Sequence, residues 1–401
     1  MKFPINKIFI DKKAKEFDLT KRILRNSNTP HEIVTGHDLH SCTINKGKKT
    51  LYVTVPQGEV IKQCPGTGEP YICCRYFVIN QQIQCPMDCT YCILQNYLSS
   101  AYLTMYADIN LICQQVETFL KKYPHRLFRI GTGELTDSLA LDYLSEVTLD
   151  FLKFFSREKN TIIEFKTKTD TIQNLLRFPL DNAVISWSVN PQELVKKYEI
   201  HSASLKKRLQ AAQKCQDKGF MLGFHFDPLL YVQNWEELYK EVIDQIFSSV
   251  DSSRIAWVSL GSLRYPPELQ RIMKKRFPGY QIIYEEMILG LDGKLRYPRP
   301  LRIAMFKKIY DYLKCKDADL FIYFCMESED VWERVMGKNP ESNAGLDYWF
   351  AESIQARFPQ VKMDPPQREE YEQYPDERLT YRERKKEEKN LDKRQKKKDK
   401  R

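Results

Sequence analysis

The chain has 401 residues, of which 42% are hydrophobic and 12% are aromatic, enough for one large domain with appendages or for two domains. The net charge of +10 permits a polyanionic partner such as nucleic acid without requiring one. No run approaches the roughly 20 apolar residues of a membrane span, and the N-terminus lacks the pattern of a signal peptide. We therefore expect a cytoplasmic protein, whose 11 cysteines indicate metal ligation or thiol chemistry rather than disulfides.

Residues 1–74 form a mixed, loop-rich segment that we expect to be an N-terminal cysteine-bearing subdomain. It closes with Cys64, a turn-rich Pro-Gly-Thr-Gly stretch, and the adjacent Cys73 and Cys74.

Residues 75–278 alternate strand-like apolar runs with amphipathic helical stretches. The six strand candidates are 74–81, 127–133, 161–169, 183–190, 221–230 and 255–263, and helical patterns cover 110–123, 139–155, 205–219 and 235–249. Six strands, each followed by a helix, predict parallel βαβ units that curl into a barrel or a doubly wound sheet. In either fold the active site lies at the carboxyl ends of the strands.

Residues 279–358 form a shorter α/β extension, in which we expect a strand at 321–327 and a following helix to close or cap the barrel. Met326 and Trp332 are expected in its core. Residues 359–401 become almost wholly charged, which predicts a disordered or fraying tail.

Cys85, Cys89 and Cys92 lie in a single loop directly after the first strand. Three thiolates can hold a 4Fe–4S cubane and leave one iron open for a small molecule, whereas a structural zinc needs a fourth protein ligand. A zinc loop completed by a distant Cys or His is the alternative.

The Cys-x3-Cys-x2-Cys spacing, with Tyr91 just before the third cysteine, is the signature of radical S-adenosylmethionine (SAM) enzymes. From Cys85 to Arg264 the sequence resembles the spore photoproduct lyase, or DNA-repair-photolyase-like, branch of that superfamily. Four features carry the resemblance: the CTYCILQNYL segment, the Thr-Lys pair ending the third strand, Ser-x-Asn ending the fourth, and Leu-Gly-Phe opening the fifth.

The resemblance implies an α/β fold with a partial (β/α)6 TIM-type barrel, and reductive cleavage of SAM to methionine and a 5′-deoxyadenosyl radical. It also implies a flavodoxin or ferredoxin as electron donor. The cluster ligands would be Cys85, Cys89 and Cys92, with Tyr91 near the adenine. The remaining SAM-binding residues would be Gly131, Thr132, Gly133, Glu134, Lys168, Ser188 and Asn190.

Spore photoproduct lyases proper carry a cysteine just after the second strand, and residues 131–138 contain none. We therefore interpret the chain as a relative of these lyases. Cys73 and Cys74 are candidate hydrogen-atom donors or, with Cys64, ligands of a second metal centre, and buried packing side chains are the alternative. The isolated Cys42, Cys113, Cys215, Cys315 and Cys325 are expected to pack.

Three more positions at the strand ends are substrate candidates. His225 and Asp227 alternate along the fifth strand and share one face, so they would meet the substrate if that face is the barrel interior, or form a buried hydrogen-bonded pair. Arg264 could clamp a phosphate, with a surface position as the alternative. Asp137, like Glu134, could bind SAM or substrate, or cap a helix.

Family analogy suggests a damaged pyrimidine or another nucleic-acid component as substrate. The alternatives are RNA, a peptide or a small metabolite, or a non-catalytic zinc or Fe–S module that binds nucleic acid.

Overall fold

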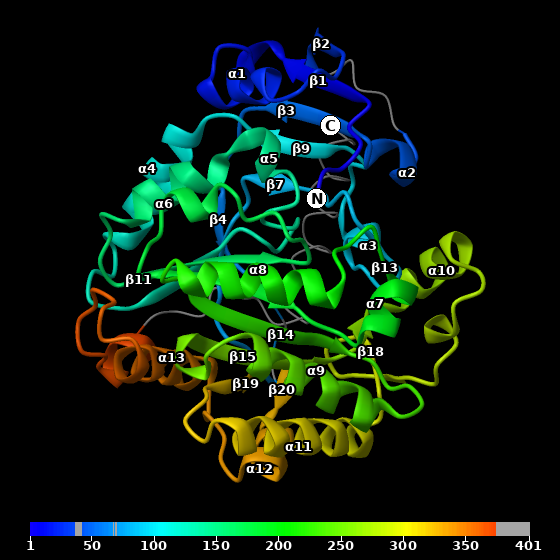
Figure 1. Cartoon of the computed structure of the whole chain (residues 1–401), viewed down its shortest axis with the longest axis vertical. Coiled ribbons are helices and arrows are strands. Elements are labelled where there is room, and N and C mark those ends of the chain that lie inside the picture. The colour runs from blue at the N-terminus through cyan, green and yellow to red at the C-terminus, as the bar shows by residue number, and fades with distance from the viewer. Residues whose placement is uncertain (37–41, 67, 69, 374–401) are drawn as a thin grey trace, which may run out of the picture.

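The computed structural model describes residues 1–36, 42–66, 68 and 70–373. An eight-stranded sheet curls through the middle of the molecule and stays open at both edges (Figure 1). Seven of its strands are parallel, and β4 pairs antiparallel at one edge. In spatial order they are β19 (Ile322–Phe324), β15 (Ile255–Ser262), β14 (Met221–Leu229), β12 (Ala183–Ser188), β11 (Thr161–Thr167), β10 (Phe128–Gly131), β6 (Phe77–Ile79) and β4 (Ile61–Gln63).

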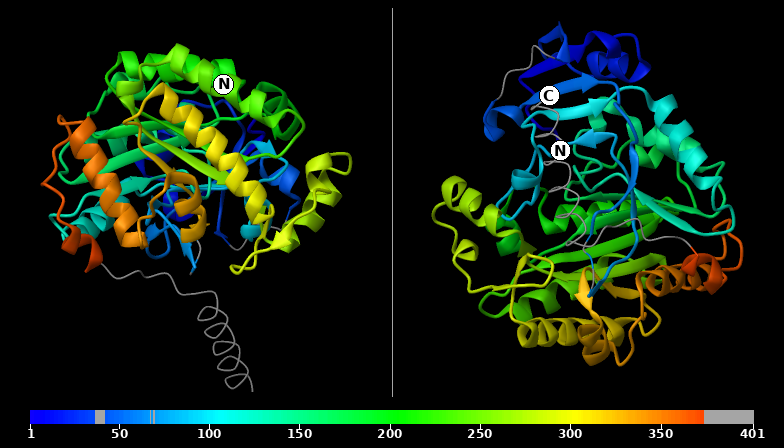
Figure 2. Two further views of the ribbon diagram at one scale, coloured as in Figure 1. Left: turned by 90° about the horizontal axis from the view of Figure 1, so that it is seen from below. Right: turned by 180° about the vertical axis from the view of Figure 1, so that it is seen from behind.

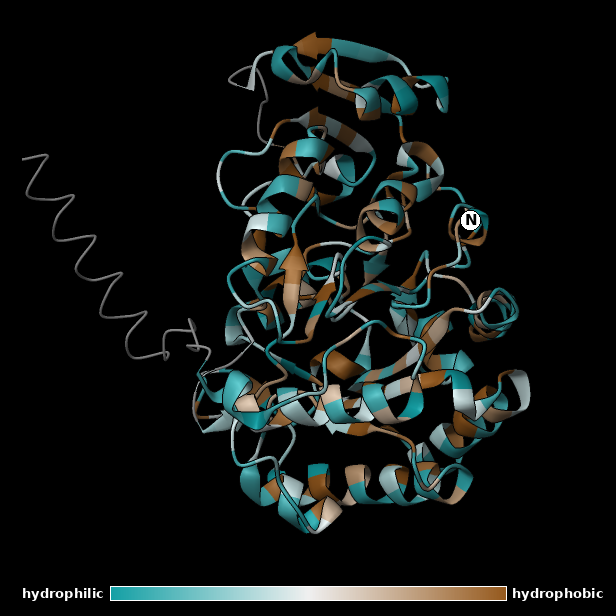
Figure 3. Ribbon diagram, turned by 90° about the vertical axis from the view of Figure 1, so that its left-hand side faces the viewer, coloured by the Kyte–Doolittle hydropathy of each residue, from teal (hydrophilic) through white to brown (hydrophobic). Residues whose placement is uncertain are grey.

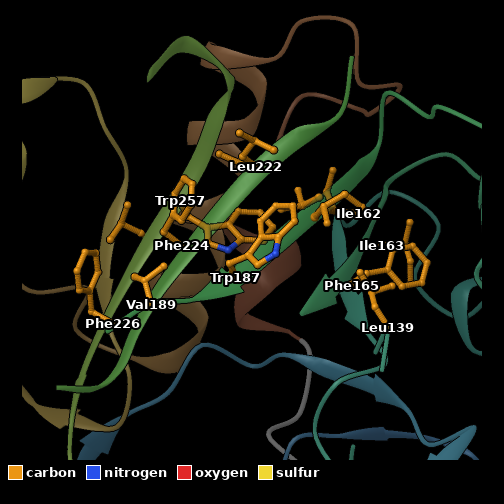
Figure 4. Packing of buried hydrophobic residues seen from close by; sticks show 14 of the residues in the cluster. Leu139, Ile162, Ile163, Phe165, Trp187, Val189, Leu222, Phe224, Phe226 and Trp257 are labelled. Carbon is orange, nitrogen blue, oxygen red and sulfur yellow. The ribbon is translucent and has the colours of Figure 1, made fainter. Parts of the chain in front are cut away.

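The alternation of side chains along these strands decides which residues reach the barrel interior. Ile163 and Phe165 on β11 and Trp187 on β12 belong to the packed hydrophobic core (Figure 4). Glu164 lies on the opposite face from its two neighbours, because successive strand residues point to opposite faces. There it is joined through a hydrogen bond to Ser186 of β12, so polar side chains gather on the inner face.

The crossover helices cover the outer face of the sheet. They are α4 (Ile109–Leu120), α5 (Asp142–Ser145), α6 (Val147–Phe155), α7 (Gln192–Tyr198), α8 (Leu205–Asp217), α9 (Trp235–Ser249) and α11 (Arg299–Lys316). Helix α10 (Pro267–Arg276) instead packs against α3 (Leu94–Tyr97) at the side of the barrel. Figure 3 shows helices that carry both hydrophilic and hydrophobic positions around more uniformly hydrophobic strands, as expected for amphipathic helices on a buried sheet. Asp108 and Ser204 cap α4 and α8 by accepting from backbone N–H groups of their first turns.

A second, five-stranded sheet packs beside the barrel, at the top of Figure 1. Its order is β2 (His31–Val34), β1 (Lys7–Asp11), β3 (Thr50–Thr54), β9 (Leu103–Tyr106) and β7 (Gln82–Ile83). Its helices are α1 (Asp18–Arg25) and α2 (Ile44–Gly47). The sheet therefore takes two strands from beyond residue 74, on either side of the cysteine loop.

Short ladders tie distant loops together. β8 (Asp88–Cys89) pairs with β13 (Glu199–Ile200), and β5 (Tyr71–Ile72) pairs with β20 (Glu327–Ser328). β16 (Arg264–Tyr265), β18 (Leu295–Arg296) and β17 (Ile288–Leu289) form a small antiparallel sheet. The remaining helices are α12 (Glu329–Met336), α13 (Asn343–Arg357) and α14 (Arg368–Glu372); both views in Figure 2 show the C-terminal helices against the barrel.

The partial barrel and all six predicted strands are confirmed, with three differences. The connection from β11 to β12 holds one 3-10 turn, Leu175–Arg177, in place of the predicted helix. The strand predicted near 321–327 is β19, which extends the sheet beside β15 as a seventh parallel strand. The predicted tail is ordered as far as residue 373, because Tyr371 is fully buried and its hydroxyl accepts from the Leu127 backbone N–H; residues 374–401 lie outside the described part. Among the described helices, none is both long and apolar enough to cross a bilayer.

Candidate functional site

A cavity of about 320 Å³ opens at the carboxyl ends of the barrel strands, within the size range of small-molecule sites. Its walls come from the cysteine loop, from the loops after β10 and β11, and from the ends of β12, β14, β15 and β18. The lining residues are Cys85, Met87, Cys89, Tyr91, Cys92, Ile93, Leu94, Gly133, Glu134, Thr136, Asp137, Lys166, Thr167, Lys168, Ser188, Asp227, Pro228, Leu263, Arg264, Lys294 and Met326.

The cysteine loop is anchored at both ends. At its start the Gln84 backbone N–H donates to the Leu135 carbonyl (2.8 Å) and the Thr136 hydroxyl donates to the Gln84 carbonyl (2.9 Å), which fixes the loop against the loop after β10. In its middle, Asp88 accepts from Lys48 (3.0 Å) and from Arg276 (2.7 Å). Burial raises the pKa of Asp88, but these two cations outweigh it and lower the pKa below its ordinary value.

All three loop thiols line the same cavity, as a shared metal centre requires. Burial, with repulsion from Asp137, raises the pKa of Cys85 to about 12, and burial with repulsion from Glu199 raises that of Cys89 well above its usual value. Without a metal Cys85 and Cys89 are protonated, so a cationic centre would have to supply the charge that stabilises their thiolates.

A tetranuclear iron–sulfur cluster fits this set of thiol donors, since three cysteines from one loop line a single cavity and no fourth cysteine or histidine of the described residues lines it with them. Within the described ranges, no three His, Cys, Asp or Glu side chains already converge on one point. Binding would therefore reorient the thiols. The same holds for Cys64, Cys73 and Cys74, so a second centre there stays a prediction.

Glu199 lies in the wall behind the cysteine loop and is hydrogen-bonded to four side chains. It was not identified from the sequence. The carboxylate is fully buried and accepts from Tyr91, Lys168 (3.1 Å), Asn190 (3.0 Å) and Arg208 (2.5 Å). Burial raises the pKa of Glu199, but Arg208 and then Lys168 lower it far below its ordinary value. Three residues that the resemblance assigned to SAM binding thus share one buried anion.

The loop after β10 places two carboxylates with different surroundings. Asp137 accepts from the backbone of Lys168 (2.7 Å) and Leu139 (3.0 Å) and from the Thr167 hydroxyl (2.8 Å), so it holds two loops together. Glu134 faces the cavity, where burial raises its pKa to about 7. Of the two, Glu134 is free to receive a ligand's ammonium group.

Each of the two glycines of this loop lies against a different side chain that leaves no room for a Cβ. A Cβ at Gly131 would lie 1.4 Å from the Tyr76 hydroxyl oxygen, and a Cβ at Gly133 would lie 2.8 Å from the Ser138 hydroxyl oxygen. Gly133 lines the cavity, whereas Gly131 lies below it. Thr132 points away from the cavity and donates to Ser138 (2.8 Å).

His225 belongs to a buried network on the inner barrel face. Its Nε2 lies 2.7 Å from Glu164 and its Nδ1 lies 2.6 Å from Ser259. Burial and Lys166 lower the pKa of His225, and although burial raises the pKa of Glu164, His225 brings it down to about 2. His225 does not line the cavity, and it is buried and hydrogen-bonded as the alternative expected. Its partners are Glu164 and Ser259, however, and not Asp227, which pairs with Arg264 instead.

Asp227 and Arg264 form an ion pair on the cavity wall, at 3.0 and 3.2 Å. Arg264 is not a surface arginine, since 11% of its side chain is exposed. Its guanidinium also donates to the sulfurs of Met326 (3.3 Å) and Cys325 (3.1 Å). Met326 was expected in the core but lines the cavity, because its positive φ of 58° turns the chain there after β19.

Two cavity cations were not singled out from the sequence. Lys166 shares the inner face of β11 with Glu164, a position that its spacing could have indicated. Lys294 donates to the Gly66 carbonyl (3.0 Å) and to the Met326 sulfur (3.4 Å). Its place depends on the fold of β16, β18 and β17, for which the sequence offered no signal.

The remaining predicted positions lie off the cavity. Asn190 is fully buried and bridges Glu199 and Tyr239. Cys73 and Cys74 do not line the cavity; the Cys74 thiol interacts with Arg129, and burial raises its pKa. Of the isolated cysteines, Cys215 is buried as expected, whereas Cys315 is exposed.

Comparison with known proteins gives the family. A model of the family described as spore photoproduct lyase matches residues 1–298. Spore photoproduct lyase of Bacillus subtilis is 23% identical over 206 residues, which cover 50% of this chain and 60% of that protein. The Clostridium acetobutylicum protein is 21% identical over 322 residues, or 76% and 90% of the two chains. The chain thus aligns with about three fifths of the Bacillus protein and most of the Clostridium protein.

Solved structures show the same fold. A cysteine-to-alanine variant of spore photoproduct lyase with dinucleoside spore photoproduct has a TM-score of 0.73 at 20% identity, covering 81% of this chain and all of that one. A double variant with bound AdoMet and dinucleoside spore photoproduct has a TM-score of 0.72 at 19% identity, with the same coverage. With the family model spanning most of the sequence, this chain belongs to the spore photoproduct lyase family.

Proposed function

We propose that the chain is a radical SAM enzyme acting on a damaged pyrimidine in nucleic acid. One observation carries the proposal: Cys85, Cys89 and Cys92 line the same cavity as Glu134 and other polar side chains at the strand ends. A structural metal site would not need those residues. Family membership supports the proposal, as does the related spore photoproduct lyase structure with bound AdoMet and dinucleoside spore photoproduct.

The cluster, when bound, would supply one electron to SAM, which releases methionine and a 5′-deoxyadenosyl radical. The protein's own contribution is to orient SAM. Glu134 would accept the SAM ammonium group, while Ser188 and Lys168 would donate to its carboxylate. Glu199 holds both Lys168 and Tyr91 through hydrogen bonds, and so positions Lys168 for the SAM carboxylate and Tyr91 for the adenine.

The far wall would receive the substrate. Arg264, Lys294 and Lys166 place cationic groups around the cavity, which suits a phosphodiester. Asp227 fixes the direction of the Arg264 guanidinium. His225 does not reach the cavity; it lies behind this wall, hydrogen-bonded to Glu164.

The hairpin of β17 and β18 favours a nucleic-acid substrate over a small metabolite. Its Leu289 and Leu291 are 63% and 76% exposed, and Ile288 is 49% exposed. Lys294, on the same hairpin, lines the cavity. Apolar side chains at such a position can enter between bases and help to extract a lesion from the duplex.

The hydrogen donor would differ from that of the lyases proper, because the loop after β10 has no cysteine. We therefore propose a relative of these enzymes with its own lesion preference. Cys73 and Cys74 remain the predicted donors. The Cys325 sulfur accepts a hydrogen bond from Arg264 behind the cavity wall. Burial raises the pKa of the Cys325 thiol, and Cys74 and Cys73 lie close enough to raise it further, so the three thiols would form one group. We also propose that a flavodoxin or ferredoxin supplies the electron and that the protein is cytoplasmic.

The test is lesion repair by anaerobically reconstituted protein with dithionite and SAM. Ultraviolet-irradiated DNA would be digested and each thymine photoproduct quantified by chromatography, beside a Cys89→Ala control. Loss of one photoproduct with the active chain alone supports the proposal. SAM cleavage with unchanged photoproducts would move the substrate to RNA, a peptide or a metabolite. Stoichiometric zinc in a colourless protein would favour the non-catalytic module.

A further inference from the structure

A second cavity, of about 310 Å³, lies beside the cysteine-lined one. One wall is α7, which follows β12, and another is the loop of residues 230–233, which follows β14. The third wall comes from the 3-10 turn Gln281–Ile283 and from Tyr297, directly after β18; Figure 1 shows α7 and β18 near each other. Because β12 and β14 are neighbouring parallel strands, the segments that follow them lie at the same end of the barrel as the first cavity.

The two cavities adjoin at two places along the chain. Asp227 of β14 lines the first cavity, and Leu230, directly after β14, lines the second. Lys294, just before β18, lines the first cavity, and Tyr297, just after β18, lines the second. The β17–β18 hairpin, to which we assign the opening of the duplex, therefore borders both cavities.

The inside of the second cavity is apolar and aromatic. Leu194, Tyr198, Ile282 and Tyr297 are buried there. The ring of Tyr231 is 39% exposed and lies edge-on to Tyr297, with the ring centroids 6.2 Å apart. An aromatic ring that remains partly exposed can stack on a nucleobase.

The rim of the second cavity carries polar side chains that the protein does not use. Glu193, Gln233, Gln281 and Glu285 line the cavity, and across the described residues their side chains make no hydrogen bond or ion pair. Lys197 also lines it, with its ammonium nitrogen 5.1 Å from the centroid of the Tyr198 ring. The cavity thus offers two amides, two carboxylates and one cation to a ligand.

The Tyr297 hydroxyl adds a buried donor. It accepts from the Tyr231 backbone N–H (3.2 Å), and its own proton has no acceptor within the described part of the chain. Burial raises the pKa of Tyr297, and Glu285 raises it further, so the hydroxyl keeps its proton. A ligand with an acceptor atom would satisfy this group.

These groups match an adenine better than a thymine or a phosphate. Carboxylate and amide oxygens accept from the N6 amino group of adenine, and an amide also donates to its N7. Thymine has no amino group, and Glu193 and Glu285 would repel a phosphate. Lys197 could receive the phosphate that follows the base, outside the cavity.

We propose that the second cavity receives an adenine from the strand opposite the lesion when the β17–β18 hairpin opens the duplex. The inference rests on the proposed function and extends it, because an opposite strand exists only if the substrate is duplex DNA. When the lesion leaves the helix, the adenine that faced it loses its pairing partner. Stacking on Tyr231 and hydrogen bonds to Gln281 and Glu285 would replace those lost contacts.

The experiment is a double-mutant cycle between Tyr231 and the opposite base. The probes are labelled duplexes that carry the thymine photoproduct lost in the repair assay, opposite either two adenines or two abasic residues. Their Kd for the reconstituted full chain is measured by fluorescence anisotropy without a reductant, so that the lesion is not consumed. Tyr231→Ala removes the ring, and Tyr231→Phe, which keeps it, is the matched control.

With adenines opposite the lesion, Tyr231→Ala should bind at least about fivefold more weakly than the wild type and Tyr231→Phe, the lower end for stacking of one base on an aromatic side chain. With abasic residues, all three proteins should bind equally. Equal binding of the adenine duplex would overturn the proposal. A loss that persists with the abasic duplex would also overturn it, since the ring would then act on the lesion strand or on the fold.

Gln281→Ala keeps the test decisive if Tyr231→Ala does not fold, because the Gln281 side chain is exposed. It should weaken binding of the adenine duplex about threefold and leave binding of the abasic duplex unchanged; equal binding of both by Gln281→Ala and the wild type would refute the proposal. Failure of the proposed function would look different. The wild type would then bind the lesion duplex no more tightly than an undamaged duplex of the same sequence, and the inference would fall with it.

Discussion

Replacing Glu199 by glutamine tests how far the wall of the cavity depends on one buried charge. The carboxylate is the shared partner of Arg208 and Lys168, and 1% of its side chain is exposed. Glutamine keeps the size and one acceptor oxygen but leaves the fully buried Arg208 guanidinium without a counter-ion. Removing one partner of a buried ion pair costs about 3–5 kcal/mol, and we expect a loss of that size.

The pH dependence has a definite sign. Because Arg208 and Lys168 hold the pKa of Glu199 below its ordinary 4.5, the stabilisation is fully present above pH 4.5 and is lost as the pH falls further. The difference between the wild type and Glu199→Gln should therefore be constant from pH 6 to 8 and shrink in acid.

Urea unfolding, followed by circular dichroism at pH 7, measures the effect. Glu193→Gln, on the exposed side of α7, removes the same charge from the surface and should change stability by less than about 0.5 kcal/mol. A loss below about 1 kcal/mol in Glu199→Gln, or a loss equal to that of Glu193→Gln, would refute the argument that this anion organises the wall.

Two further predictions concern ligand recognition. Since burial raises the pKa of Glu134 to about 7, SAM affinity by calorimetry should weaken as the pH falls from 8 to 6. Glu134→Gln should bind SAM weakly at both pH values. A wild-type SAM affinity that does not change with pH would contradict this role of Glu134. Without SAM, Glu134→Gln should be up to about 3 kcal/mol more stable than the wild type at pH 8, since a carboxyl group with a raised pKa costs stability as the pH rises from 4.5 through 7. Leu289→Ser/Leu291→Ser should keep the melting temperature, because both side chains are exposed. It should slow processing of a lesion in duplex DNA but not in a dinucleotide, and equal slowing of both would rule out a role in opening the duplex.

The sequence allowed prediction of features that depend on local spacing. Three cysteines in one loop and the polar groups ending successive strands follow from motif and periodicity, and the fold brings many of them to one cavity. The same alternation placed His225 and Asp227 on one face correctly. Only the ends of strands reach the cavity, however, and His225 lies one step too deep.

Features that depend on contacts between distant parts of the chain could not be predicted from the sequence. In the sequence, Glu199 follows a short lysine-rich helix and looks like an ordinary charged residue. Its role arises because β13 pairs with β8, which brings Glu199 opposite Cys89, 110 residues earlier in the chain. Met326 reads as core because it follows the apolar β19, but its positive φ turns the chain toward Arg264. Lys294 likewise depends on the hairpin that follows α10.

The central claim is reductive SAM cleavage at a cluster held by Cys85, Cys89 and Cys92. The most direct measurement is 5′-deoxyadenosine, quantified by chromatography after anaerobic reconstitution and addition of dithionite and SAM. We predict formation by the wild type and none by Cys89→Ala. A reconstituted wild type that holds iron and sulfide yet neither binds SAM nor releases 5′-deoxyadenosine would contradict the claim.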